Sequence, residues 1–399
     1  MPLKNKSFKL LALASHPIQY QAPFFKAIAK SDEIDLTVLF YSRWGLESYY
    51  DEGFKKEFKW DIPLLEGYDY KFLRNCSFKS NPSKFFGSIN FEVLDYLNSQ
   101  VYDAVWVHGW NSFTNWLVFM STNLKHLPIM LRCETNLLNP IQPVKAKLKK
   151  AILKNLFKRV SSFLPVGRYN AEFYKTYGVS DERMFLVPYV VDNDFFFTNE
   201  KKYVAKGSTI KHSYKIPDKL PVILFSGKLT DVKCPMDLLK AFAVVSNKQQ
   251  AVLIYVGDGP MLAKMQKYVR KHKLKNVFFM GFKNQTELSE IYSIADIFVL
   301  PSKFEPWGLV VNEAMCFGKP VIVSDKVGAG GDLVKTGENG FVFEVGDISM
   351  LADCLEKLLS DEVKREEMGK RSLSIIRNWS FDIGIQGLLQ SLYYIKKLK

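Results

Sequence analysis

The sequence predicts an α/β protein made of two doubly wound, Rossmann-like halves. Short apolar runs, typical of parallel strands buried on both faces, alternate with segments of helical periodicity over residues 10–177 and again over residues 222–317. Such alternation indicates a mostly parallel sheet with helices on both faces. The chain has 399 residues, enough for two hydrophobic cores. We therefore expect two sheets in two domains.

The first half contains five apolar runs separated by amphipathic segments. The expected strands are residues 10–14, 34–41, 104–107, 128–131 and 163–166, and the expected helices are residues 22–29, 92–98, 116–124, 144–160 and 171–177. Residues 66–88 are irregular, basic and aromatic, so we expect loops there, at a sheet edge or over a cleft.

The second half repeats the pattern after a polar, lysine-rich stretch. Its expected strands are residues 222–226, 251–256, 277–280, 297–300, 320–324 and 340–343, and its helices are residues 235–246, 261–271, 286–294 and 309–317. The tail, residues 349–399, predicts two or three more helices. We therefore divide the chain into a first domain, a linker, a second domain and a helical tail that could pack back on the first domain, with bounds 1–200, 201–219, 220–375 and 376–399.

Composition limits the class of protein and its compartment. A charged fraction of 24% and a hydrophobic fraction of 47% are ordinary for a globular protein. Five scattered cysteines without a C-x-x-C pair argue against a zinc site and a disulfide framework, which favours a reducing, cytoplasmic location. No run approaches the roughly 20 apolar residues of a membrane span. The net charge of +14 suits a phosphorylated substrate, an anionic surface or nucleic acid.

The stretch from Ser302 to Met315 is a strand-to-helix turn that carries two glutamates. Glu305 lies in the turn, and Glu313 follows eight residues later, about two turns into the expected helix. Free backbone N–H groups and the helix dipole at such a turn favour an anion. From spacing alone, two interpretations stay open: the glutamates bracket one ligand, or Glu305 caps the helix and Glu313 faces solvent.

Other strand-end turns offer groups for a phosphorylated ligand. Gly227 allows a tight turn after the strand 222–226, and Lys228 and Lys233 could converge on a diphosphate. The alternative is a solvated turn. Gly257 begins Gly-Asp-Gly-Pro, which lacks dinucleotide spacing and favours a plain tight turn. A third turn could lie beside a planar base, and it consists of Gly281, Phe282 and Lys283.

The first half also places polar residues at its strand ends. His108 ends the strand 104–107 and is equally well interpreted as catalytic or structural. His16 has the equivalent place after the first strand, followed by Gln19 and Tyr20. Arg132 and Glu134 follow the strand 128–131. These residues are candidates for a second substrate site.

Asp192-Asn193-Asp194 allows a competing interpretation, because a D-x-D motif can hold a divalent metal that bridges phosphates. It lies far in sequence from the lysine and glutamate turns. We favour a turn or hinge and expect no metal.

The segment 144–160 is basic and amphipathic, with an apolar residue at every fourth position: Val144, Leu148, Ile152, Leu156 and Val160. Seven lysines and arginines and no acidic residue lie between them. The stripe packs on the sheet, or the helix lies on an anionic membrane surface. The two interpretations are compatible if only the lysine face of the helix meets lipid headgroups. Peripheral attachment to the inner face of the membrane therefore stays an open alternative.

Taken together, these turns resemble the retaining glycosyltransferases of the GT-B fold, family 4. The order of motifs carries the resemblance: strand-Gly-Lys-Leu with a following lysine, Val-Gly-Asp-Gly-Pro, Gly-Phe, and Phe-Glu-Pro-Trp-Gly-Leu-Val-Val-Asn-Glu-Ala with its two glutamates eight apart. It covers nearly the whole chain and is strongest over residues 186–347. The resemblance implies two Rossmann-like domains that face each other across a cleft, with the acceptor on the first and a nucleotide-sugar donor on the second.

The resemblance also assigns roles at the matched positions. Lys228 and Lys233 would hold the donor diphosphate, Glu305 would face the sugar hydroxyls and Glu313 the ribose hydroxyls. Backbone N–H groups from Gly308 through Leu309 to Val310 would hold the distal phosphate, and His108 would match the active-site histidine. The residues expected to contact the donor are thus Gly227, Lys228, Lys233, Gly257, Gly281, Phe282, Lys283, Glu305, Gly308, Leu309, Val310 and Glu313.

The implied reaction is front-face transfer of a hexosyl or N-acetylhexosaminyl group, with retention, to a glycan or lipid-linked acceptor. It needs no metal or cofactor and fits surface polysaccharide or glycoconjugate synthesis. The loop at residues 15–21 departs from the family, because it lacks the usual paired glycines. Three alternatives stay open: a sugar-nucleotide epimerase, a phosphorylase, and a non-catalytic protein that binds membrane or nucleic acid. No nucleic-acid-binding module is visible, so no nucleic-acid partner is expected.

Overall fold

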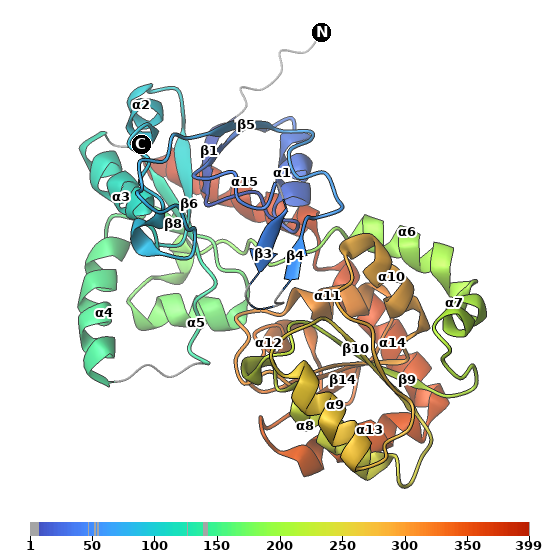
Figure 1. Ribbon diagram of the computed structural model, residues 1–399. Helices are drawn as coiled ribbons and strands as arrows, with labels where there is room; N and C mark the ends of the chain where they lie inside the picture. Colours follow the sequence, from blue (N-terminus) through green and yellow to red (C-terminus); the bar gives the residue numbers. More distant parts are fainter. Residues whose placement is uncertain are drawn as a thin grey trace. The chain divides into compact units, whose positions relative to one another are not determined.

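The computed structural model describes residues 8–398 except 47, 52, 54–55, 126 and 139–142. Within this part the chain forms two compact units. The first unit comprises Met1–Tyr49, Pro63–Tyr189 and Phe381–Lys399, and the second comprises Tyr50–Ile62 and Val190–Ser380. Each unit contains one parallel sheet flanked by helices (Figure 1). The predicted α/β class with two Rossmann-like sheets is therefore confirmed.

The sheet of the first unit has the order β5-β2-β1-β6-β7-β8 in the described part of the chain. Its strands are β1 (Phe8–Ala14), β2 (Ile34–Phe40), β5 (Asp69–Phe72), β6 (Ala104–His108), β7 (Ile129–Arg132) and β8 (Ser162–Phe163). β1 pairs with both β2 and β6 in parallel register. β5 lies within the region expected to be irregular, which thus contains an edge strand that alternation did not reveal.

Helices cover both faces of this sheet because alternate strand residues point to opposite sides. On one face Trp106 packs edge-on against Phe24 of α1 (Ala22–Ala29), with ring centroids 6.2 Å apart. On the other face Val105 and Val107 belong to a core built with helices α2 (Val93–Asn98), α3 (Phe113–Lys125), α4 (Pro143–Phe157) and α5 (Arg168–Thr176).

The C-terminal helix, α15 (Phe381–Leu398), packs in the first unit. Phe381 stacks on Phe24 with centroids 5.5 Å apart. The buried hydroxyls of Ser391 and Ser162 form a hydrogen bond of 2.6 Å. The tail that joins the first unit thus begins at residue 381, five residues later than the expected bound of 376.

The sheet of the second unit has the order β11-β10-β9-β12-β13-β14 in its described part. Its strands are β9 (Val222–Ser226), β10 (Val252–Val256), β11 (Val277–Phe279), β12 (Ile297–Leu300), β13 (Val321–Ser324) and β14 (Gly340–Phe343). Its helices are α8 (Pro235–Val245), α9 (Leu262–Lys271), α10 (Gln285–Ile294), α11 (Leu309–Cys316), α12 (Gly330–Leu333), α13 (Ile348–Leu359) and α14 (Glu362–Arg377). The four central strands are buried along their whole length, as expected of parallel strands.

The expected linker is wrong in position and in structure. Residues 201–219 are largely helical, within α6 (Asn193–Val204) and α7 (Gly207–Ser213), and the second unit begins at residue 190. The reason is tertiary packing: the buried Asn193 amide donates to the carbonyls of Ile376 and Trp379, at 3.1 Å each. Phe196 is fully buried, 6.3 Å from the ring of Phe317.

A short segment from the first half of the chain also belongs to the second unit. We call residues 50–62 the strap. It contains β4 (Lys56–Phe58), which pairs with β3 (Tyr49–Asp51) in a two-stranded sheet (Figure 1). The expectation that residues 1–200 form one domain is therefore wrong for the strap as well as for residues 190–200.

Candidate active site

The turns that follow β9, β10 and β11 are joined by backbone hydrogen bonds at the carboxyl ends of these strands in the second unit. The N–H of Gly227 donates to Val256 at 2.9 Å, and that of Gly257 donates to Gly281 at 2.8 Å. A Cβ atom on Gly257 would lie 2.0 Å from the Gly227 carbonyl oxygen, so only glycine allows this approach. The sheet order therefore brings together the three turns that the sequence singled out.

Lys228 and Lys233 each form an ion pair at the carboxyl end of this sheet. The Lys228 ammonium lies 2.9 Å from the Asp51 carboxylate of the strap, and the exposed fractions of the two side chains are 37% and 14%. Lys233 pairs with Glu305. Burial, and then the neighbouring Lys228 charge, lower the pKa of Lys233 to about 8, while the Glu305 pair favours its charged form. Both lysines therefore have a carboxylate partner.

Glu305 is held rigidly in the loop between β12 and α11. Its N–H donates to the Lys326 carbonyl at 3.0 Å, and its own carbonyl accepts from Gly328 at 2.9 Å. Gly308, with φ of 98°, then begins α11. Leu309 and Val310 are the first helical residues, and the first N–H groups of an α-helix have no acceptor within the helix. Glu305 does not cap α11, because the N-cap residue is Gly308 and the Glu305 carboxylate pairs with Lys233, so ligand contact by Glu305 stays a prediction.

Glu313 lies inside the unit and does not form part of a solvated face. It is partly buried and accepts a hydrogen bond of 2.8 Å from the Tyr292 hydroxyl of α10. Burial raises the pKa of Glu313 to about 7, although the Tyr292 hydrogen bond opposes the shift. Sequence reasoning missed Tyr292, because nothing in the spacing of α10 marks one tyrosine as a partner of a glutamate on another helix.

The turn expected beside a planar base, Gly281 to Lys283, lies at the start of α10. Gly281 has a φ of 67°, and the ammonium of strap residue Lys56 lies 5.7 Å from the Phe282 ring centroid. Lys283 forms an ion pair of 2.9 Å with Glu287. Strap residue Asp61 accepts a hydrogen bond of 3.1 Å from the N–H of Thr286. The strap therefore contacts two of the three turns that follow β9, β10 and β11.

The first unit contains a pocket of about 330 Å³ at the carboxyl ends of β1, β6 and β7. His108, Arg132, Tyr20 and Glu134 are among the residues that line it, as the sequence predicts. The residues that we did not predict are Gln21 and Tyr189, together with Ser15, Ile18, Gly109, Trp110, Asn111, Cys133 and Thr135. The pocket therefore gathers polar groups from three strand ends.

His108 is a neutral, partly buried group in this pocket. Its Nδ1 lies 3.5 Å from the Gln21 amide nitrogen, and its ring packs 4.6 Å from that of Trp106. Burial, and then the Arg132 guanidinium, lower the pKa of His108 well below 6.5. The imidazole is therefore uncharged near neutral pH and can exchange hydrogen bonds with a bound molecule.

Two predicted candidates lie outside the pocket lining. Gln19 is in the turn before α1, and His16 packs edge-on against Trp44 with centroids 5.0 Å apart. The Ser15 hydroxyl lies 2.9 Å from His16 Nδ1, and burial lowers the pKa of His16 to about 4. These contacts give His16 a packing role in the loop of residues 15–21.

The D-x-D motif has a structural explanation. Asp192 caps α6 by accepting a hydrogen bond of 3.0 Å from the N–H of Phe195, whereas Asp194 is exposed. Within the described part of the chain, no group of three or more histidine, cysteine, aspartate or glutamate side chains could hold a metal ion. The favoured turn role of Asp192 therefore agrees with its contacts.

In the described part of residues 144–160, the expected apolar stripe is confirmed at Leu156 and Val160 and wrong at Ile152. Ile152 is 43% exposed, whereas Leu153 is buried together with Leu156, Phe157 and Val160. Spacings of three and four residues follow the 3.6-residue turn, whereas a strict repeat of four drifts around the helix. The side chains of Val144 and Leu148 lie outside the described residues. Among the described residues, no helix is long and apolar enough to span a membrane.

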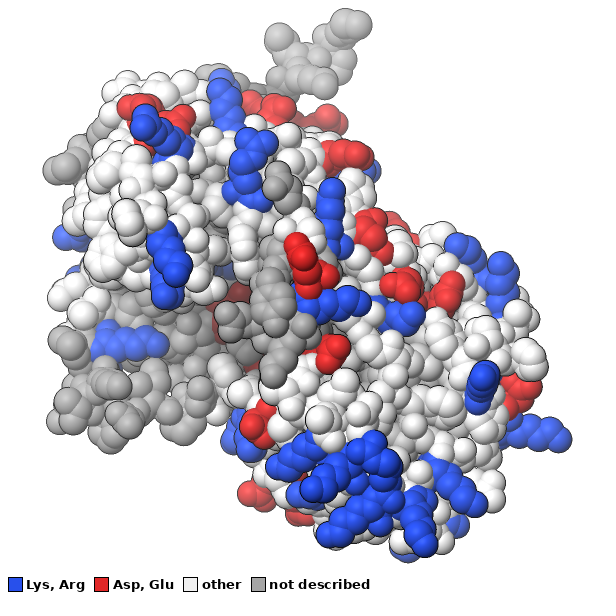
Figure 2. Space-filling view, viewed as in Figure 1, with Lys and Arg blue, Asp and Glu red and all other residues white. Residues whose placement is uncertain are grey.

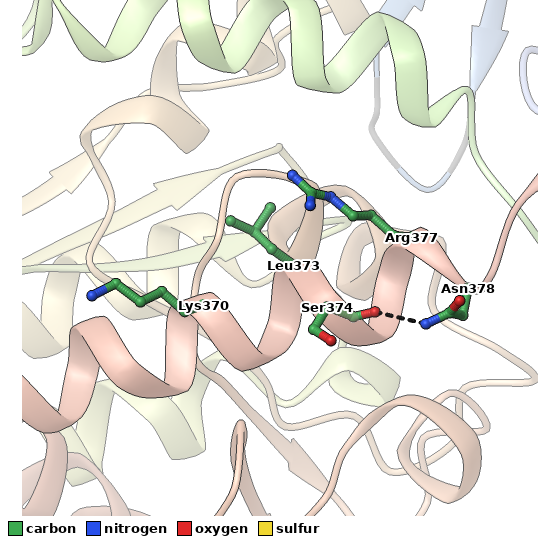
Figure 3. Close-up of a pocket in the computed structure, with 5 residues that line it drawn as sticks. All are labelled: Lys370, Leu373, Ser374, Arg377 and Asn378. Carbon is green, nitrogen blue, oxygen red and sulfur yellow. Dashed lines mark hydrogen bonds between the residues drawn. The ribbon is translucent and has the colours of Figure 1, made fainter.

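Two further surface features stand apart from these sites. Figure 2 shows basic side chains gathered over α9, which carries Lys264, Lys267, Arg270 and Lys271. A groove along α14, shown in Figure 3, is lined by Lys370, Leu373, Ser374, Arg377 and Asn378. Every polar side chain of this groove is exposed, so it lacks the buried groups of a binding site.

The family comparison matches the glycosyl transferases group 1 model at residues 208–374. Among curated relatives, the N-acetyl-alpha-D-glucosaminyl L-malate synthase of Bacillus anthracis is 30% identical over 200 residues, which are 50% of this chain and 52% of the relative. A D-inositol 3-phosphate glycosyltransferase of Corynebacterium diphtheriae is 30% identical over 45% of this chain and 43% of its own. These matches thus span about half the length of the relatives.

Solved structures resemble the whole chain. A glycosyltransferase from Rickettsia africae has a TM-score of 0.75 at 15% identity and covers 99% of this chain and 100% of its own. HepE of Anabaena, solved in complex with UDP and glucose, has a TM-score of 0.70 at 19% identity and covers 97% of this chain and 99% of its own. At these identities the likeness concerns the fold. Residues 208–374 therefore match the glycosyl transferases group 1 model, and the two Rossmann-like units give the chain the GT-B fold.

Proposed function

We propose that the protein transfers a sugar from a nucleotide-sugar donor to a glycan or lipid-linked acceptor. One observation carries the proposal. The carboxyl end of the second unit's sheet gathers Lys228, Lys233, Glu305 and the start of α11, all within the region that matches the family model. Parallel α/β sheets bind ligands at the carboxyl ends of their strands. The lysines would hold the diphosphate, and the helix N-terminus would hold its distal phosphate. Glu305 would accept hydrogen bonds from the sugar and Glu313 from the ribose.

The proposed mechanism is front-face transfer with retention and without a metal. The acceptor hydroxyl attacks the anomeric carbon on the side from which the diphosphate leaves, and a departing phosphate oxygen takes its proton. The bond from the anomeric carbon to the phosphate oxygen breaks as the new glycosidic bond forms. The protein then has to position the substrates and stabilise charge on the leaving group, which cations and a helix dipole do well. His108 would donate or accept a hydrogen bond beside the transferred sugar.

Binding of nucleotide diphosphates tests the donor site directly. We would titrate UDP, GDP and dTDP into the protein and its Lys233→Ala variant by calorimetry. Hydrogen bonds to charged groups contribute about 1.5–3 kcal/mol, so the variant should bind roughly 10- to 100-fold more weakly. Lys264→Ala removes the same charge from an exposed position on α9 and should leave the affinity unchanged. If no diphosphate binds to the wild-type protein, the proposal is wrong.

The finer claims need product analysis with the donor so identified. NMR of the product should show the anomeric configuration of the donor, and transfer should persist in excess EDTA. Donor turnover that needs no acceptor would indicate an epimerase instead. Attachment to an anionic membrane through the segment 144–160 also belongs to the proposal, since Lys154, Lys158 and Arg159 are exposed. It predicts co-sedimentation with phosphatidylglycerol vesicles that weakens with added salt.

A further inference from the structure

The pocket of the first unit is built around a buried cation. Arg132 ends β7 and is only 4% exposed. Its Nη2 donates to the Pro188 carbonyl at 2.9 Å, and its guanidinium lies over the Tyr189 ring, 4.6 Å from the centroid. Its Nε has no hydrogen-bond partner among the described residues. A buried charge is costly unless it is paired, so this guanidinium needs an explanation.

No neighbouring carboxylate explains how the buried Arg132 charge is stabilised. Glu134 is the acidic residue that lines the same pocket, but it is exposed, and no described carboxylate oxygen lies within 4.0 Å of the Arg132 nitrogens. The exposed Glu134 carboxylate acts on Arg132 only across a longer distance. The aromatic face of Tyr189 supplies a cation–π contact, which compensates for part of the lost hydration.

Two more buried polar atoms in the pocket lack partners in the described part of the chain. They are Gln21 Oε1 and His108 Nε2, and the Gln21 side chain is only 8% exposed. Gln21 and His108 contact each other through their other polar atoms, at 3.5 Å. Arg132, Gln21 and His108 therefore offer a donor fork, an acceptor and an imidazole nitrogen to one small molecule.

We propose that this pocket binds an anionic group of the acceptor, a carboxylate or a phosphate, on Arg132. The inference rests on the proposed function, and it adds the chemical class of the acceptor. A guanidinium donates two parallel hydrogen bonds to two oxygens of one anionic group, which a neutral sugar cannot match. The pocket volume of about 330 Å³ suits a small polar head rather than a long chain. Gln21 and His108 then bind hydroxyl groups of the same molecule.

The test compares three sugars that differ only at carbon 6: glucuronate, glucose 6-phosphate and glucose. Each is titrated into the full-length protein by calorimetry at low salt. We expect at least one anionic sugar to bind 10-fold or more tightly than glucose, and the better one identifies carboxylate or phosphate. Arg132→Gln should weaken its binding roughly 10- to 100-fold. Glu134→Gln should strengthen it, since it removes a negative charge at an exposed site that folding tolerates.

Several outcomes overturn the inference. Equal binding of all three sugars by the wild-type protein does so, and so does an anion preference that both variants leave unchanged. If Arg132→Gln does not fold, as judged by its urea-unfolding curve, Glu134→Gln decides by its direction. UDP binding is measured in parallel: anion binding that depends on Arg132 supports the inference even if UDP fails to bind and the donor proposal falls. UDP binding without any anion preference overturns only the inference.

Discussion

The strap offers a sharp test of the donor site, because Asp51 holds the ammonium that we assign to the diphosphate. Both Asp51 carboxylate oxygens lie 2.9 Å from Lys228 Nζ. A bound diphosphate would compete with this carboxylate for the same cation. Asp51→Asn removes the competing charge and keeps the shape of the side chain. We therefore expect the variant to bind UDP more tightly than the wild-type protein.

The exposure of the pair sets the size of the effect. Lys228 is 37% exposed and Asp51 14%, so solvent and salt screen their attraction. Ion pairs of this kind contribute about 0.2–1 kcal/mol, which corresponds to about 1.4- to 5-fold in Kd. Calorimetric titration of UDP at 50 mM salt resolves such a change. The gain should shrink at 500 mM salt, because screening weakens the pair that the variant removes.

Asp61→Asn is the matched control, since it makes the same charge change on the same strap. Asp61 binds the N–H of Thr286 and has no contact with Lys228 among the described residues. Its variant should lose about 1 kcal/mol of stability, as at other helix N-termini, and should bind UDP as the wild type does. Equal gains in affinity from both variants would mean that general charge, and not competition at Lys228, controls binding. A loss of affinity in Asp51→Asn would refute the reasoning.

Three further variants probe the rest of the site. The raised pKa of Glu313, about 7, means that the native state binds more protons than the unfolded state between about pH 4.5 and 7. The free energy of unfolding should therefore fall by up to about 3 kcal/mol as the pH rises through this range, and Glu313→Gln should flatten the urea-unfolding profile. Lys233 loses its charge as the pH rises through about 8, so UDP affinity should fall there by calorimetry, and Lys233→Arg should abolish the fall. Gly308→Ala places a Cβ atom 3.0 Å from Leu300 at a φ of 98°, and urea unfolding should show a loss of about 1–3 kcal/mol.

Much of the fold follows from the sequence, because buried parallel strands show as continuous apolar runs. β9 and β10 have no exposed residue, and the sequence marks both. β5 could not be found this way, since three of its four residues are exposed at the sheet edge. The helical linker could not be found either. Its position depends on Asn193 and Phe196 packing into the second unit, which local pattern does not encode.

The residues in strand-end turns of the candidate site were predictable from the sequence. The contacts between side chains that are far apart in the sequence were not. Gly227 and Lys228 directly follow β9, and Glu305 lies in the loop after β12, so their convergence follows once the strands are parallel. Asp51 is separated from Lys228 by 177 residues and lies in the short strand β3, which carries no motif of its own. Likewise, Arg132 was visible from the sequence as a charged residue at a strand end. That its Nε lacks a partner is a property of the packed structure alone.

The two lysine pairs differ in a way that orders the proposed events at the donor site. Glu305 is fixed by backbone hydrogen bonds on both sides, so Lys233 keeps a constant partner, the residue that we assign to the sugar. Asp51 lies in the two-stranded sheet of β3 and β4, and a sheet of two strands has little stability of its own. Lys228 is also more exposed than Lys233, at 37% against 24%. The diphosphate should therefore displace Asp51 before it affects Glu305, and Asp51→Asn should speed UDP association more than it slows dissociation, because the competing contact is removed from the free state.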